Sequence, residues 1–471
     1  MNDFFARSST SQLPVFSRGP VIFVWSIWVV MLLMALACIF LYGRNIPLAE
    51  DWLMVAPLTG NEPDMAGWLW MQNNEHRIPL PKIIFLFLLK ITNGDFRSGM
   101  VLNVMSAGLL AAGLIRVFKY IRGKTIYPDA FFPIILLHIG NWENFFWSWQ
   151  IGFVLPTVLA CTLIIIIVRY TGLLQLRIAI IAAICTICLP LCGANGLMYL
   201  LPTIPLLSYE AVLHFRSKEA GASRRVGAIL FSAIGLTIFI LVVYFIGYER
   251  PYWNPPSPDI KSTLVTSAKF MALGLGPGAA SSWRLSVFTV MILLASTAIL
   301  LLNALLKSRG VEFRRCIGII FFMGGCLVFA LAMGWGRAAL IPKYGLPIRY
   351  VLLAIPALII CYSSWEIYGS PFLRNAIQWS LFLVMFLMIL PNTKVGFSWR
   401  NWYLNGADAV FKDIKNDIPN SRIAERNQTF LLHWDKQMLI NRMQQLKEAG
   451  MGPFKNMKDD QFSNDTSSYN K

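Results

Sequence analysis

Long apolar runs separated by short polar connections dominate this chain of 471 residues. A helix needs about 20 mostly apolar residues to cross a bilayer, so these runs predict membrane-spanning helices. We predict about eleven crossings, at 21–42, 98–118, 130–142, 150–168, 178–195, 197–212, 226–248, 285–306, 316–335, 350–368 and 376–390. The predicted fold class is therefore an all-α polytopic membrane protein.

The apolar run at 79–92 is predicted not to cross. Two prolines open it, and Lys82 and Lys90 interrupt it, so it is short for a span and suits a helix at the outer interface. A cluster of basic residues follows the run at 98–118. If 79–92 crossed, that cluster would face outward, against the tendency of Lys and Arg to collect in cytoplasmic loops.

The distribution of polar and apolar segments divides the chain into a short polar N-terminal segment, a membrane domain and a polar C-terminal region. The first crossing is too long for the apolar part of a cleavable signal peptide and lacks a small-residue cleavage pattern, so it resembles a signal anchor. We expect a cytoplasmic N-terminus and a periplasmic C-terminus, with one or two amphipathic helices in a small C-terminal appendage. The expected divisions are 1–20 (cytoplasmic), 21–391 (transmembrane, with 44–97 as the first outer loop) and 392–471 (periplasmic appendage).

Composition supports a membrane location. The chain is 56% hydrophobic and only 14% charged, with a mean hydropathy of +0.57, more apolar surface than a soluble protein can bury. The net charge of +17 is explained by basic inner loops, so we expect a lipid bilayer and no nucleic acid as partner. The eight cysteines lie in apolar segments, which argues against a disulfide framework.

Glu50 and Asp51 open the first outer loop and are the candidate catalytic residues. Because they are adjacent, both side chains cannot point into one pocket. We expect one to face a site and the other to cap a helix or face solvent. A carboxylate here can act as a general base that takes a proton from an acceptor hydroxyl. The alternative is that Asp51 merely caps a short helix that begins at Trp52.

A second polar cluster, Glu75-His76-Arg77, precedes the predicted interfacial helix. It is a candidate for substrate binding, and the alternative is a local ion pair with side chains that snorkel to the interface. Metal use stays open because no ligand spacing requires a metal. The side chains that could together hold a divalent cation are Asp51, Glu75, His76 and Glu143.

Two later outer loops and one turn add candidates for substrate binding. Aromatic rings beside a carboxylate and amides suit a sugar, whose C–H faces stack while its hydroxyls need hydrogen-bond partners. Outer cations run against the positive-inside trend and suit a substrate phosphate, or else ordinary lipid headgroups. The candidates are Glu143, Asn144, Trp147 and Gln150 in one loop, Asn195 in a glycine-flanked turn, and Arg337, Lys343, Arg349 and Tyr350 in the other loop.

Three short segments carry a resemblance to a known group: Asn-Glu-His-Arg-Ile-Pro-Leu-Pro-Lys, Trp-Glu-Asn-Phe-Phe-Trp-Ser-Trp-Gln and Gly-Arg…Arg-Tyr. With the layout of residues 20–390, they resemble the GT-C superfamily of membrane glycosyltransferases, and bacterial O-antigen glucosyltransferases of the serotype-conversion type. That group has an acid and an interfacial helix in the first outer loop and a second acidic element in the next. A clear Asp-x-Asp or Asp-Glu pair is missing here.

The resemblance implies roles for particular residues. Asp51 or Glu50 would be the catalytic base, and Arg337 or Arg349 would hold the phosphate of a polyprenyl-phosphate sugar. The expected function is inverting transfer of that sugar to a hydroxyl of a cell-surface glycan or lipid-linked oligosaccharide, at the periplasmic face of a bacterial inner membrane.

Two other functions remain open. An O-antigen polymerase or ligase would centre its chemistry on arginines of the later loops rather than on the first loop. A polysaccharide or lipid transporter would have no covalent product, and transporters usually place ionisable residues within their helices. The predicted crossings here are almost free of charge, which favours the enzyme.

Overall fold

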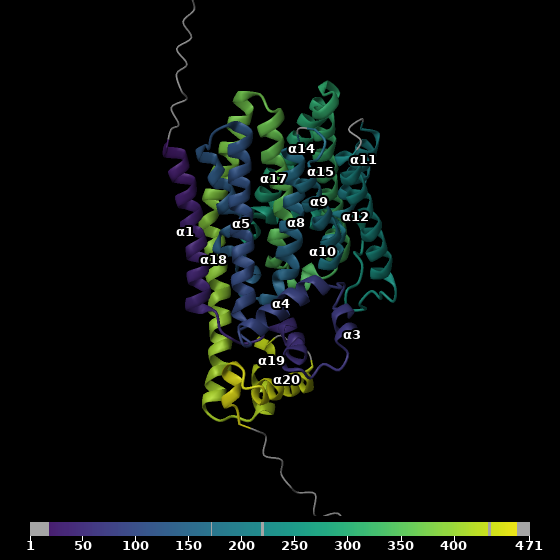
Figure 1. Cartoon of the computed structure of the whole chain (residues 1–471). Helices are drawn as coiled ribbons and strands as arrows, with labels where there is room; N and C mark the ends of the chain where they lie inside the picture. Colours follow the sequence, from purple (N-terminus) through teal and green to yellow (C-terminus); the bar gives the residue numbers. More distant parts are fainter. Residues whose placement is uncertain (1–17, 171, 218–220, 432–434, 459–471) are drawn as a thin grey trace, which may run out of the picture.

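The computed structural model describes residues 18–170, 172–217, 221–431 and 435–458, and this part of the chain is helical without a β-strand. The helices form an upright bundle (Figure 1). The described chain begins at one end of the bundle, and its C-terminal helices lie beyond the other end, beside the first interhelical loop.

Eight helices of the described chain are long and apolar enough to cross a membrane, which indicates a multi-pass membrane protein. They bury their faces against one another in a single apolar core. These eight are α1 (Arg18–Tyr42), α5 (Arg97–Arg122), α8 (Ile151–Val168), α12 (Ala222–Phe245), α14 (Trp283–Lys307), α15 (Gly310–Arg337), α17 (Val351–Tyr368) and α18 (Pro371–Lys415).

The other three predicted crossings correspond to shorter helices. At a rise of 1.5 Å per residue, the 13-residue α9 is about 20 Å long and the 17-residue α11 about 26 Å, against a hydrocarbon layer of about 30 Å. The predicted crossing at 130–142 is divided into two short helices, α6 and α7. The shorter α-helices are α2 (Val55–Thr59), α3 (Met65–Trp70), α4 (Pro79–Ile91), α6 (Phe131–Leu137), α7 (Trp142–Phe146), α9 (Leu176–Cys188), α10 (Ala194–Leu197), α11 (Leu200–Arg216), α13 (Ile260–Ala272), α16 (Ile341–Tyr344), α19 (Asn420–Leu431) and α20 (Lys436–Glu448).

The break in the predicted crossing at 130–142 falls at His138. Its ψ of 145° is extended and ends α6, and a 3-10 turn then leads into α7. The side-chain amide of Asn141 donates to the carbonyl of Leu136 at 3.3 Å and so satisfies one of the carbonyls left free at the end of α6. After this break, α7 leads into the segment of Trp147, Trp149 and Gln150, which lines the cavity described below.

The sequence pattern predicted that the last crossing ends before Pro391, but the helix does not end there. α18 continues through this proline to Lys415. Next to it, the Asn392 side chain accepts from the backbone N–H of Gly278 at 2.8 Å and donates to the carbonyl of Leu275 at 3.0 Å. These contacts with a neighbouring segment hold the helix where the proline removes an internal hydrogen bond.

The extension of α18 carries α19 and α20 beneath the first loop (Figure 1). Trp52 is fully buried there, and its ring packs edge-on against Phe454 with centroids 5.8 Å apart. The Tyr403 hydroxyl accepts from the backbone N–H of Arg44 at 3.0 Å. The C-terminal region therefore supports the loop that carries Glu50.

Candidate functional site

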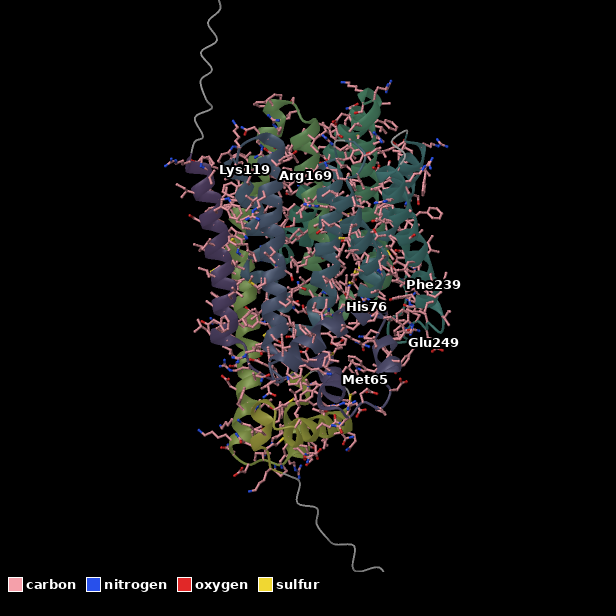
Figure 2. All side chains as sticks on the ribbon, viewed as in Figure 1. Met65, His76, Lys119, Arg169, Phe239 and Glu249 are labelled. Atoms are coloured by element: carbon pink, nitrogen blue, oxygen red, sulfur yellow. The ribbon has the colours of Figure 1, made fainter. Side chains whose placement is uncertain are left out.

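One cavity collects polar residues from four separate parts of the chain at the end of the bundle that holds the first loop. Figure 2 labels His76 near this end, and Lys119 and Arg169 at the other. The residues that line the cavity come from the first loop, the segment from the end of α7 to the start of α8, the helix α10 and the region around the connection from α15 to α17. They are Glu50, Asn73, Asn74, Glu75, His76, Ile78, Trp147, Trp149, Gln150, Gly152, Phe153, Asn195, Arg337, Arg349 and Tyr350.

The adjacent acids have different environments. Glu50 lines the cavity; its Oε1 accepts from the amide of Asn74 at 3.3 Å, and its buried Oε2 has no hydrogen-bond partner among the described residues. Burial raises the pKa of Glu50, and the charge of Arg349 only partly opposes this shift. Ala49 adopts a φ of 48°, a left-handed conformation that is uncommon for alanine, at the turn into this pair.

Asp51 does not line the cavity. Its side chain is fully buried, its Oδ1 accepts from the backbone N–H of Trp149 at 2.9 Å, and its Oδ2 accepts from that of Leu48 at 3.2 Å. Burial raises its pKa well above the usual value, although the two backbone hydrogen bonds act in the opposite direction. In this geometry Asp51 caps a short 3-10 helix, Ala49–Met54, and ties the first loop to the segment before α8.

Replacing Asp51 with asparagine is expected to lower stability by about 1–3 kcal/mol, because the new NH₂ group would face a buried backbone N–H and leave it unsatisfied. Asp64→Asn is the matched control: Asp64 accepts from Gly67 N at 2.8 Å in an exposed position, and asparagine caps a helix about as well. Thermal unfolding of the purified variants measures the difference. Equal unfolding temperatures would contradict this structural role.

Glu75 and Arg337 form one ion pair at the cavity wall. The amide of Asn254 also donates to Glu75, and its Oδ1 accepts from Arg337 at 2.8 Å. Burial raises the pKa of Glu75, but Arg337 and His76 outweigh it, and the pKa is lowered overall. Burial lowers the pKa of His76 to about 4, so the imidazole is neutral at pH 7. Its Nδ1 accepts from Ala194 N at 3.2 Å, which leaves Nε2 as the N–H donor.

Glu143 and Arg349 form the second ion pair. One carboxylate oxygen of Glu143 accepts from the Arg349 guanidinium and the other from its backbone N–H at 3.0 Å. Asn144 donates to the Arg349 carbonyl at 3.2 Å. Glu143 and Asn144 thus fix the loop that carries Arg349 and lie behind the cavity wall. The Arg349 guanidinium lies 5.7 Å from the ring centroid of Trp147 and 5.6 Å from that of Tyr350.

Several buried polar atoms at the cavity have no hydrogen-bond partner among the described residues. They are Oε2 of Glu50, Nε1 of Trp147 and both amide atoms of Gln150. Buried polar groups are almost always hydrogen-bonded, so these atoms are available to a polar ligand or to water. The rings of Phe153 and Tyr350 stack nearby with centroids 6.0 Å apart. The lining thus combines aromatic faces with donors and acceptors, as a sugar requires.

Two basic residues of the first loop, Arg77 and Lys82, do not line the cavity and instead bind backbone carbonyls. Arg77 donates to the carbonyls of Trp70, Tyr244, Ile246 and Gly247. Lys82 donates to the carbonyl of Trp68 at 2.6 Å and to two others at the end of α3. Burial lowers the pKa of Lys82 to about 8. Arg77, predicted to bind substrate, therefore joins the first loop to the end of α12. The side chain of Lys343 lies outside the described part of the structure.

Sequence reasoning missed several lining residues, notably Asn73, Asn74, Trp149 and Phe153. The two asparagines stand in the same polar loop as Glu75, and Asn74 has a φ of 52° that Asn tolerates better than most residues. An Asn-Asn pair in a loop between acids could have indicated this turn. Nothing local distinguishes Phe153 from the other apolar residues of α8.

Two further cavities follow from the first, one beyond the other. One of about 310 Å³ shares Glu75, His76, Asn195, Arg337 and Tyr350 with it and adds Met198, Tyr248, Arg250, Asn254 and Trp335 to its lining. The next cavity, of about 400 Å³, shares Met198 with the 310 Å³ cavity and no lining residue with the polar one. Its lining consists of apolar side chains of α10, α11 and α12 and the turn between α10 and α11. The polar site therefore continues into an apolar groove along the bundle.

Among the described residues, no group of three or more His, Cys, Asp or Glu side chains is placed to hold a metal ion. The four predicted ligands have other partners, as the contacts above show. Comparison with protein-family models, curated proteins and solved structures finds no match for this chain. Fold and site together define a multi-pass membrane protein with a polar cavity at one end of its bundle.

Proposed function

We propose that this chain is an inverting membrane glycosyltransferase of the GT-C type, which moves a sugar from a polyprenyl-phosphate donor to a hydroxyl of a cell-surface glycan or lipid-linked oligosaccharide. The observation that carries the proposal is the cavity itself. In it, the carboxylate of Glu50, with one buried oxygen free of partners among the described residues, shares the lining with Arg337 and Arg349. Acid and cations on one small cavity suit a reaction that removes a proton and releases a phosphate.

In the proposed reaction, Glu50 takes the proton of the acceptor hydroxyl as its oxygen bonds to the anomeric carbon of the sugar. The bond from that carbon to the phosphate oxygen breaks, and polyprenyl phosphate leaves with the electron pair. Attack opposite the leaving group inverts the anomeric carbon. Each guanidinium has five N–H donors, so Arg337 and Arg349 can bind the phosphate and keep their carboxylate partners. Their fixed positions favour the charge that develops on the leaving group.

The adjoining cavities support a donor with a lipid tail. The apolar groove beside α11 suits a polyprenyl chain, because its lining offers no polar group. The cavity between this groove and the polar site is lined by Arg250 and Arg337, and a phosphate where it meets the polar site would also lie near Arg349. The sugar would then lie among Trp147, Gln150 and Tyr350. This order, from apolar to cationic to polar and aromatic, follows the order of groups in a polyprenyl-phosphate sugar.

The proposed location is the bacterial inner membrane with the site at its periplasmic face. Here α9, α11 and the broken α6–α7 segment also cross, in addition to the eight longer helices, which gives the eleven predicted crossings. An odd number of crossings puts the two termini on opposite sides. The start of α1 at one end of the bundle and the position of α20 beyond the other end are consistent with this topology.

The direct test is incubation of the purified full-length protein in lipid nanodiscs with radiolabelled polyprenyl-phosphate sugars and a glycan acceptor. We expect acceptor-dependent release of polyprenyl phosphate and an inverted linkage in the product. The variant Glu50→Gln, which is expected to be much slower, provides the control. Movement of lipid-linked sugar across vesicles without any covalent product would contradict the proposal and favour a transporter.

A further inference from the structure

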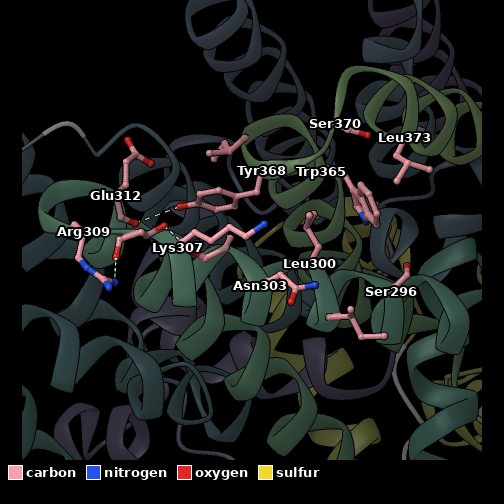
Figure 3. Close-up of a pocket in the computed structure, with 14 residues that line it drawn as sticks. Ser296, Leu300, Asn303, Lys307, Arg309, Glu312, Trp365, Tyr368, Ser370 and Leu373 are labelled. Carbon is pink, nitrogen blue, oxygen red and sulfur yellow. Dashed lines mark hydrogen bonds between the residues drawn. The ribbon is translucent and has the colours of Figure 1, made fainter.

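A separate cavity of about 860 Å³ lies at the end of the bundle opposite the candidate site (Figure 3). It is an open cavity bordered by α14, the start of α15, the end of α17 and the start of α18. The connections between these helices lie at the same end of the bundle. The lining residues are Ser296, Ile299, Leu300, Asn303, Ala304, Lys307, Ser308, Arg309, Glu312, Trp365, Ile367, Tyr368, Ser370 and Leu373.

The cavity has an apolar wall and a polar rim. The wall includes Ile299 and Leu373, whose side chains are 61% and 46% exposed although they belong to helices apolar enough to cross a membrane. The rim includes Asn303, Lys307 and Ser370, near the ends of the same helices. A bilayer presents the same sequence of environments, from acyl chains to headgroups, so the cavity matches an amphipathic lipid.

The charge of the rim is positive. Lys307 has no ion-pair partner among the described residues, and in Figure 3 its side chain extends across the cavity. Within the described ranges, Arg309 donates to two backbone carbonyls, those of Leu306 and Ser308, and to no carboxylate. The one acid in the lining, Glu312, pairs with Arg315 at 3.3 Å. Two cations therefore remain available at the cavity.

We propose that this cavity binds one anionic glycerophospholipid, with its phosphate at Lys307 and its acyl chains against the apolar wall between α14 and α18. Basic pockets between transmembrane helices are suited to anionic lipid headgroups. A soluble phosphate would use the rim but gain nothing from the wall, which is why the structure favours a lipid. The proposal is independent of the sugar transfer proposed above, because the two sites lie at opposite ends of the bundle.

Native mass spectrometry of the detergent-purified full chain, titrated with phosphatidylglycerol or phosphatidylcholine, tests the proposal. We expect preferential retention of phosphatidylglycerol and about fivefold weaker retention in Lys307→Gln, since one cation near an anionic lipid surface contributes about that factor. Ala304→Trp fills the cavity without removing charge and is expected to weaken retention as well. Lys119→Gln is the matched control, because Lys119 is an exposed cation at the same end outside the cavity.

Three results would overturn the proposal: equal retention of the two lipids, unchanged retention in both Lys307→Gln and Ala304→Trp, or displacement of the lipid by millimolar inorganic phosphate. The last result would identify a soluble anion as the ligand. Thermal unfolding of each variant shows whether the fold is intact; Lys307 is exposed, so its replacement is expected to leave the unfolding temperature unchanged.

Discussion

The variant Glu50→Gln is expected to transfer sugar about 10²- to 10⁴-fold more slowly than the wild type, the usual contribution of a general base. Glutamine keeps the size of the side chain and an oxygen that can accept from Asn74, but it cannot take a proton. The loss should therefore fall on kcat, with little change in donor binding. Release of polyprenyl phosphate under single-turnover conditions measures it.

The matched control for this variant is Glu249→Gln. The Glu249 side chain is exposed and does not line the cavity, so its replacement is expected to leave the rate unchanged. Wild-type activity in Glu50→Gln would exclude this residue as the base. Equal losses in both variants would point to a general effect of charge on the outer surface instead.

The pH dependence gives an independent readout of the same residue. Burial raises the pKa of Glu50 above that of an ordinary glutamate. A base works only when deprotonated, so kcat/KM should rise with pH through this raised pKa, and the acid limb should lie at higher pH than for an exposed carboxylate. His76, with a pKa of about 4, stays neutral above that value and cannot produce a limb near neutral pH. The residual activity of Glu50→Gln should lack the limb.

Replacing Arg122 with methionine is expected to destabilise the fold by about 3–5 kcal/mol, because it leaves two buried carboxylates without their main cation. Arg122, at the end of α5, pairs with Asp129 at 3.0 Å and with Glu366 of α17 at 2.7 Å. Both acids are nearly inaccessible to solvent. Tyr362 donates to Asp129 at 2.7 Å, and Gln378 of α18 donates to Glu366 at 2.7 Å, so one network joins three helices.

Arg422→Met is the control for the Arg122 variant. The Arg422–Glu425 pair is also close, at 2.9 Å, but both side chains are largely exposed. An exposed pair of this kind contributes about 0–1 kcal/mol. Equilibrium unfolding in denaturant, followed by tryptophan fluorescence, compares the two. A loss in Arg122→Met no larger than that in Arg422→Met would show that the buried network does not hold the bundle together.

Local patterns in the sequence were sufficient to predict the all-helical class and the positions of most of the long helices. Apolar runs near the length of a span predict helices wherever they occur, because a membrane admits few other structures. The short helix at 79–92 was predicted by the same logic and is present as α4. The polar loops that contribute to the cavity were also recognisable, since charged and amide residues are rare in this composition.

Contacts between residues far apart in the sequence determine several features that the local pattern could not predict. Asp51 is turned away from the cavity by a hydrogen bond to Trp149, 98 positions further along the chain, and no feature of the Glu50-Asp51 pair predicts that contact. Arg77 is likewise taken up by carbonyls at the end of α12. The continuation of α18 through Pro391 depends on the contacts of Asn392 with a distant segment.

The sequence by itself determined that this chain is a helical membrane protein and which of its loops are polar, because hydropathy and helix length are local properties. Only the tertiary structure decided which of the two adjacent acids faces the cavity. It also decided that Arg337 pairs with Glu75 and Arg349 with Glu143. The physical reason is that hydrogen bonds and ion pairs act over a few ångströms, and only the packing of the helices brings distant residues within that range.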